Sequence, residues 1–87
     1  MTFKASWRSY QKALYFDNQG DWQKAHDLID HLKDPKSAHV HAYLHRKEGD
    51  DWNARYWYNR AGQAFFEGTL EEEWLYLWGL YGDAKII

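Results

Sequence analysis

Cysteine is absent from this chain of 87 residues, so no disulfide can stabilise it and no thiolate can bind a metal ion. No apolar run reaches the roughly 18 residues that a membrane-spanning helix needs, and Met1 to Trp7 contain no apolar core of a signal peptide. We therefore expect a cytoplasmic protein that does not contact a membrane and that is stabilised by side-chain packing alone.

Basic residues are not in excess either, since 11 Lys and Arg stand against 13 Asp and Glu, for a net charge of −2. A surface without a basic stripe neutralises few phosphates, so nucleic acid is not an expected partner. The serines, Ser6, Ser9 and Ser37, lie outside any nucleophile motif, and the glycines are too dispersed to form a phosphate-binding loop. We expect neither an enzyme nor a bound cofactor.

Helix signals dominate the sequence and strand signals are nearly absent, which predicts an all-α fold. Asp34 precedes the single proline, Pro35, and this pair is typical of the N-cap and first residue of a helix. Gly20, Gly49 and Gly68 each follow a helical pattern and suit the left-handed end of a helix. The predicted helices span about residues 4–18, 22–33, 35–47, 52–66 and 70–81, and residues 83–87 are expected to form a loose tail.

The last of these helices carries the clearest signals. Thr69 and Glu72 have the spacing of a capping box. Glu71 and Glu73 add negative charge to the first turn, where the helix macrodipole favours it. Apolar residues then recur at helical spacing and predict one buried stripe: Leu70, Trp74, Leu77, Trp78 and Tyr81.

Several residues recur after 29 positions and indicate an internal repeat: Ala13, Gly20, Asp21 and Ala25 correspond to Ala42, Gly49, Asp50 and Ala54. In each unit the glycine bends the chain, the aspartate caps the second helix, and the alanines let the helices approach closely. One such unit cannot bury its apolar face alone. We therefore predict two stacked antiparallel hairpins, about 4–33 and 35–66, closed by a capping helix, about 70–81, in a single domain over residues 1–87.

The two units also resemble known helical repeats. The first resembles a tetratricopeptide repeat in Ala13, Phe16, Gly20, Asp21, Trp22, Ala25, Ile29 and Leu32. The second resembles both that family and the Sel1-like repeats, through Ala54, Trp57, Tyr58, Arg60, Ala61 and Gly62. The period of 29 is shorter than the usual period of about 34. The chain is also similar to small bacterial proteins that carry a His-Ala-Tyr-Leu-His-Arg stretch, a similarity that implies no activity.

The resemblance to tetratricopeptide repeats implies a partner-binding face, lined by the first helix of each unit. It assigns to this face Trp7, Tyr10, Leu14, Asp17, His39, Tyr43, Arg46 and Lys47. Aromatic side chains beside cations suit an acidic or C-terminal segment of a protein or peptide. The alternative is an ordinary solvated face. Trp52 and Tyr56 are expected to be partly exposed, and self-association through these aromatic side chains is the second way in which the chain could bind a protein. The leading hypothesis is a non-enzymatic module that binds a protein or peptide.

Histidines provide an alternative function, the binding of a metal ion or small ligand. His41, His45 and Glu48 stand at i, i+4 and i+7 of one helix, so they could converge on Zn²⁺, Ni²⁺ or Fe²⁺, with His26 as a possible further ligand. The competing interpretation is structural: His45 replaces a core aromatic and bonds to a neighbour such as Tyr58 or to a buried backbone carbonyl. Three histidines are expected at the surface or half-buried: His26, His31 and His39.

Overall fold

The computed structural model describes residues 2–83, which form α1 (Ser9–Asn18), α2 (Trp22–Ile29), α3 (Pro35–Lys47), α4 (Asp51–Ala61) and α5 (Leu70–Tyr81). No strand occurs within this range, so the predicted all-α class is confirmed. The predicted bounds of α3 and α5 are those observed. None of the helices in the described range has the length and apolar character that crossing a bilayer requires. Residues 84–87 of the expected tail lie outside the described residues.

Three predicted helix ends were wrong. α1 begins at Ser9 rather than at residue 4, α2 ends at Ile29 rather than at residue 33, and α4 ends at Ala61 rather than at residue 66. Gly62 ends α4 with a φ of +71°, in the left-handed region that favours glycine, whereas Gly68, the predicted stop, has no positive φ. Residues 62–69 therefore form an irregular segment that carries the chain from α4 to α5.

The predicted N-caps are confirmed by hydrogen bonds. The Asp21 carboxylate accepts from the backbone N–H of the third residue after it at 3.0 Å, and Asp34 and Asp50 make the same contact at 3.1 and 3.2 Å. Thr69 and Glu72 form the reciprocal pair of a capping box, at 2.8 and 3.0 Å. These local contacts fix where α2, α3, α4 and α5 begin.

The turns within the two hairpins have the same backbone geometry. Gly20 and Gly49 have φ values of +87° and +84°. The aspartate after each glycine donates its backbone N–H to the carbonyl five residues earlier, at 2.9 Å in both turns. Ala25 and Ala54 follow at the same distance in sequence, and both are fully buried. A glycine that adopts a positive φ without strain and a methyl side chain that permits close approach thus produce two similar hairpins.

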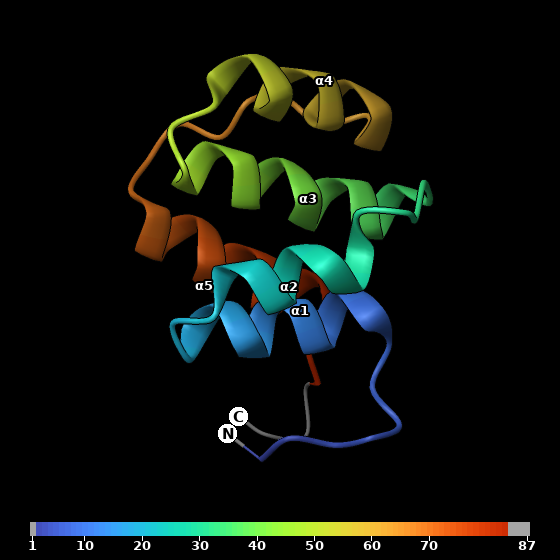
Figure 1. Ribbon diagram of the computed structural model, residues 1–87. Coiled ribbons are helices and arrows are strands. Elements are labelled where there is room, and N and C mark those ends of the chain that lie inside the picture. The colour runs from blue at the N-terminus through green and yellow to red at the C-terminus, as the bar shows by residue number, and fades with distance from the viewer. Residues whose placement is uncertain (1, 84–87) are drawn as a thin grey trace.

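Figure 1 shows α1 antiparallel to α2 and α3 antiparallel to α4, with α3 in the middle of the molecule. α3 packs against both helices of the first hairpin, and α5 packs against α1 and α3. The main core contains Ala13, Leu14, Ala25, Ile29, Val40, Tyr43, Leu44 and Leu77. The predicted stripe of α5 borders this core, and the Trp74 indole N–H donates to the carbonyl of Leu14 at 2.9 Å. α5 therefore covers one side of both hairpins.

The segment before α1 contacts Asp83, which follows α5. Lys4 Nζ lies 2.8 Å from the Asp83 carboxylate, and the Trp7 indole N–H donates to the same carboxylate at 3.3 Å. The ring of Trp7 also meets Trp78 of α5 edge to face at 5.4 Å. Asp83, which was expected in a loose tail, is instead held by these contacts.

Candidate functional site

The predicted partner-binding face lies beneath α5. Trp7 is 7% exposed, Asp17, His39 and Tyr43 are each 2% exposed, and Leu14 is fully buried. The expectation that these side chains line an open groove is therefore wrong, because the apolar stripe of α5 fills the space above them. The remaining three residues of the prediction are less covered: Tyr10 and Arg46 are half-buried and Lys47 is exposed.

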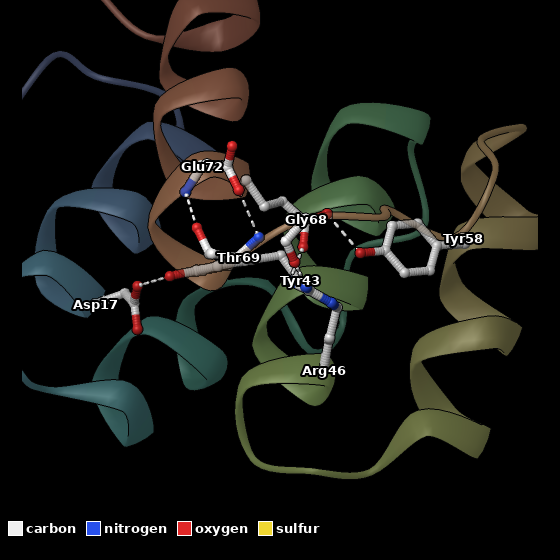
Figure 2. Close-up of polar contacts among 8 residues, drawn as sticks. Asp17, Tyr43, Arg46, Tyr58, Gly68, Thr69 and Glu72 are labelled. Atoms are coloured by element: carbon white, nitrogen blue, oxygen red, sulfur yellow. Dashed lines mark hydrogen bonds and ion pairs between the residues drawn. The ribbon is translucent and has the colours of Figure 1, made fainter.

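Asp17 joins α1 to α3 beneath this cover. Its Oδ2 accepts a hydrogen bond from the Tyr43 hydroxyl at 2.6 Å (Figure 2). Its Oδ1 lies 2.8 Å from Lys47 Nζ. Burial, and then the bond to Asp17, raise the pKa of Tyr43 far above its usual value, so the hydroxyl keeps its proton. Three residues predicted to bind a partner thus bind one another.

A second polar contact joins α3, α4 and α5. Arg46 Nη1 lies 3.0 Å from Glu73 Oε1, and Arg46 also donates to the carbonyl of Gly68. The Tyr58 hydroxyl donates to the other oxygen of Glu73. Glu73 is fully buried, and burial raises the pKa of its carboxyl, an effect that Tyr58 and Arg46 oppose. Glu73 is a key residue that the sequence interpretation missed, although it lies three residues after Leu70, within the spacing of the apolar stripe.

His39 closes the other end of the face. Its Nδ1 lies 2.8 Å from the Tyr81 hydroxyl of α5, and the Tyr81 ring meets the Tyr10 ring edge to face at 5.9 Å. His39 was expected at the surface or half-buried, and this was wrong because α5 packs over it. Burial lowers the pKa of His39 to about 4, so its ring is neutral at pH 7.

One part of the face remains open near the beginning of α5. A cavity of about 630 Å³ lies there between α1, α3 and α5, and it is lined by Asp17, Asn18, Gly20, Tyr43, Lys47, Leu70, Glu71, Trp74 and Leu75. Leu75 is 65% exposed. The wall that α5 contributes to the cavity is mostly apolar, whereas the wall from α3 carries the Lys47 ammonium. The cavity therefore combines apolar surface with a positive charge.

A cluster of three histidines forms on the other side of α3. His26 from α2 and His41 and His45 from α3 each place one ring nitrogen within 4.8 Å of the others. His26 is half-buried, as predicted, and its ring contacts that of His41 in α3. Glu48 was predicted to converge with His41 and His45, but it is not a member of this cluster. Its carboxylate instead lies 2.6 Å from His45 Nδ1. The alternative pairing of His45 with Tyr58 is also wrong, because Tyr58 donates to Glu73.

Aromatic rings fix the orientation of this histidine cluster. Trp22 stacks on His26 with centroids 4.9 Å apart, and Trp57 stacks on His41 at 4.0 Å. Trp57 therefore packs on α3. His41 is 3% exposed, and its Nδ1 has no hydrogen-bond partner within the described range. Burial, followed by the charges of His45 and His26, lowers the pKa of His41 to about 3.

Other large side chains are exposed on α4 and α5. Trp52 is 77% exposed and Tyr56 46%, in agreement with the prediction that they lie partly outside the core. Leu75, Tyr76 and Leu80 of α5 are exposed as well, at 65%, 45% and 50%. The outer surfaces of both helices therefore carry apolar contact area.

Comparisons with known proteins do not assign these sites. No family model, no curated protein and no solved structure matches the chain. The chemistry of the open cavity and of the histidine cluster is therefore the basis on which function is inferred.

Proposed function

We propose that the chain is a small, non-enzymatic helical module that binds a segment of another protein in the cavity between α1, α3 and α5. We further propose that its two hairpins are copies of one unit related to the tetratricopeptide repeats. The similar turns at Gly20 and Gly49, with a capping aspartate after each, support the second proposal.

The wall that α5 contributes to the cavity carries the first proposal. Leu70, Trp74 and Leu75 supply apolar surface to this wall. Leu75 is 65% exposed, which is a large exposed fraction for an apolar side chain. An exposed apolar patch beside a cavity is typical of interaction sites. The expected partner inserts one large apolar side chain against this wall and places its polar backbone near Lys47. Tyr76 and Leu80 are also exposed on α5, but neither residue lines the cavity.

The test is selection from a displayed peptide library, followed by titration of a selected peptide against two matched variants. Leu75→Asp alters the cavity wall, and Leu80→Asp alters an exposed leucine of the same helix that does not line the cavity. A buried leucine contact contributes roughly 1.5–3 kcal/mol, so Leu75→Asp should weaken binding about 10- to 150-fold. Leu80→Asp should leave the affinity within about threefold of the wild type.

Two results would contradict the proposal. One is a library that yields no peptide with saturable binding. The other is a peptide that binds Leu75→Asp as tightly as it binds the wild type, because its contact would then lie elsewhere. Both leucines are exposed, so circular dichroism should show that both variants keep the helical fold.

A further inference from the structure

We propose that His26, His41 and His45 form a binding site for one divalent transition-metal ion, for which Zn²⁺ is the probe. The site lies on the face of α3 opposite the cavity: Tyr43 lines the cavity, and residues two apart on a helix, such as Tyr43 and His41 or His45, point about 200° apart. It is therefore independent of the proposed partner binding.

The spacing of the ring nitrogens is close to that of a bound ion. His26 Nε2 and His41 Nε2 lie 3.1 Å apart, and a nitrogen of His45 lies within 4.8 Å of the others. Two nitrogens that bind one tetrahedral Zn²⁺ at about 2.0–2.1 Å are roughly 3.4 Å apart. A small movement of these rings would thus place an ion between them. Imidazole nitrogen is a good ligand for Zn²⁺, Ni²⁺ and Cu²⁺.

Glu48 orients His45 for this role. Its carboxylate lies 2.6 Å from His45 Nδ1, which places the proton on that nitrogen and leaves Nε2 as the ligand atom. Metal-binding histidines typically make this second contact with a carboxylate. Asp50 also lies near His45, but its carboxylate already accepts from the backbone and the side-chain amide of Asn53, at 3.2 and 2.6 Å. Glu48 is thus a positioning residue, and Asp50 belongs to the cap of α4.

His41 is poorly explained as a packing residue. Its ring is 3% exposed, and its Nδ1 has no hydrogen-bond partner among residues 2–83. An apolar residue would fill this position without burying an unpaired polar atom. The Trp57 ring stacks on it at 4.0 Å, which holds Nε2 toward His26. A metal ion would bind the Nε2 that now faces His26, and Nδ1 would keep the proton. Metal binding at Nε2 thus accounts for a histidine at this buried position.

The direct test is calorimetric titration of Zn²⁺ into tag-free protein that has been treated with a chelator. We expect saturable binding of one Zn²⁺ per chain and a rise in the melting temperature. Glu48→Gln should weaken binding about 10- to 100-fold, as loss of an orienting carboxylate does, and His45→Gln should weaken it further. His31→Gln is the matched control because His31 is exposed and lies outside the cluster. This variant should bind Zn²⁺ with the affinity of the wild type.

Imidazole nitrogen NMR identifies the ligands without any substitution of the buried His41. We expect Zn²⁺ to shift the Nε2 signals of His26, His41 and His45 and to leave those of His31 and His39 unchanged. Absence of saturable binding, equal affinity in His45→Gln, or shifts confined to His31 would each overturn the proposal.

Discussion

Replacement of Glu73 by alanine is expected to destabilise the protein strongly, because this carboxylate has no contact with solvent. Arg46 Nη1 lies 3.0 Å from it, and the Tyr58 hydroxyl donates to it. The variant leaves Tyr58 without its acceptor, which costs roughly 1–3 kcal/mol, and breaking a buried ion pair costs about 3–5 kcal/mol in total. The Arg46 side chain is 14% exposed and keeps the Gly68 carbonyl, so we expect a loss near the lower limit, about 3 kcal/mol.

Urea unfolding followed by tryptophan fluorescence measures this loss. Glu71→Ala is the matched control, since Glu71 is exposed in the same helical turn and should lose about 0.5 kcal/mol or less. Glu73→Gln keeps an acceptor for Tyr58 and should fall between the two. A Glu73→Ala variant as stable as Glu71→Ala would refute the reasoning, because the carboxylate would then not be enclosed by α3, α4 and α5.

Three further predictions concern single side chains. Gly49→Ala forces alanine to a φ of +84° and should lower the free energy of unfolding by about 1–2 kcal/mol. Gly79→Ala is the control: Gly79 lies in a helix with free space around it in the described structure, so this variant should be about 0.5–1 kcal/mol more stable. Equal effects of the two substitutions in urea unfolding would contradict the difference in backbone conformation. The pKa of His39 is lowered to about 4 and that of His41 to about 3, so each histidine should cost about 2 kcal/mol of stability as the pH drops from 7 to 5. His39→Asn, measured with chelator, should remove about half of this pH dependence, and an unchanged dependence would contradict the burial of His39. Trp74→Phe removes the 2.9 Å hydrogen bond from the indole N–H to α1 and should lower the free energy of unfolding by about 1–2 kcal/mol. Trp52→Phe, at a site that is 77% exposed, is the control and should lower it by less than about 0.5 kcal/mol. Similar melting temperatures of the two variants would contradict the contact of α5 with α1.

The beginnings of α2, α3, α4 and α5 were predictable from the sequence because their signals are local, whereas the beginning of α1 was not. The side chains of Asp21, Asp50 and Thr69 bond to backbone N–H groups three residues later, so the sequence alone contains the whole interaction. The end of α4 was not predictable in this way. Phe65 and Phe66 extend the apolar pattern past Gly62, but they lie in an irregular segment. From there they pack against a second, smaller core of Ala42, Ala54 and Tyr58. Periodicity cannot separate a continued helix from a loop that buries its aromatics.

The position of α5 depends on contacts distant in sequence, and the predicted groove failed for that reason. The stripe of α5 was predicted correctly, but nothing in its spacing indicated that it would cover α1 and α3. Glu73 was detectable, since it shares the helical spacing of Leu70, Trp74 and Leu77. The histidine cluster was partly predicted. Spacing within α3 paired His41 with His45. His26 was named only as a further candidate, because its place in the cluster depends on the packing of α2 on α3.

The central claim is that α5 lies across α1 and α3, covers most of their shared face and leaves a cavity open near its own beginning. Two-dimensional NMR measures this directly through nuclear Overhauser effects of side chains on α5. We predict cross-peaks from the Trp74 indole N–H to residues of α1 and from the Tyr81 ring to the rings of Tyr10 and His39. Cross-peaks from these α5 side chains to α4, with none to α1, would contradict the account.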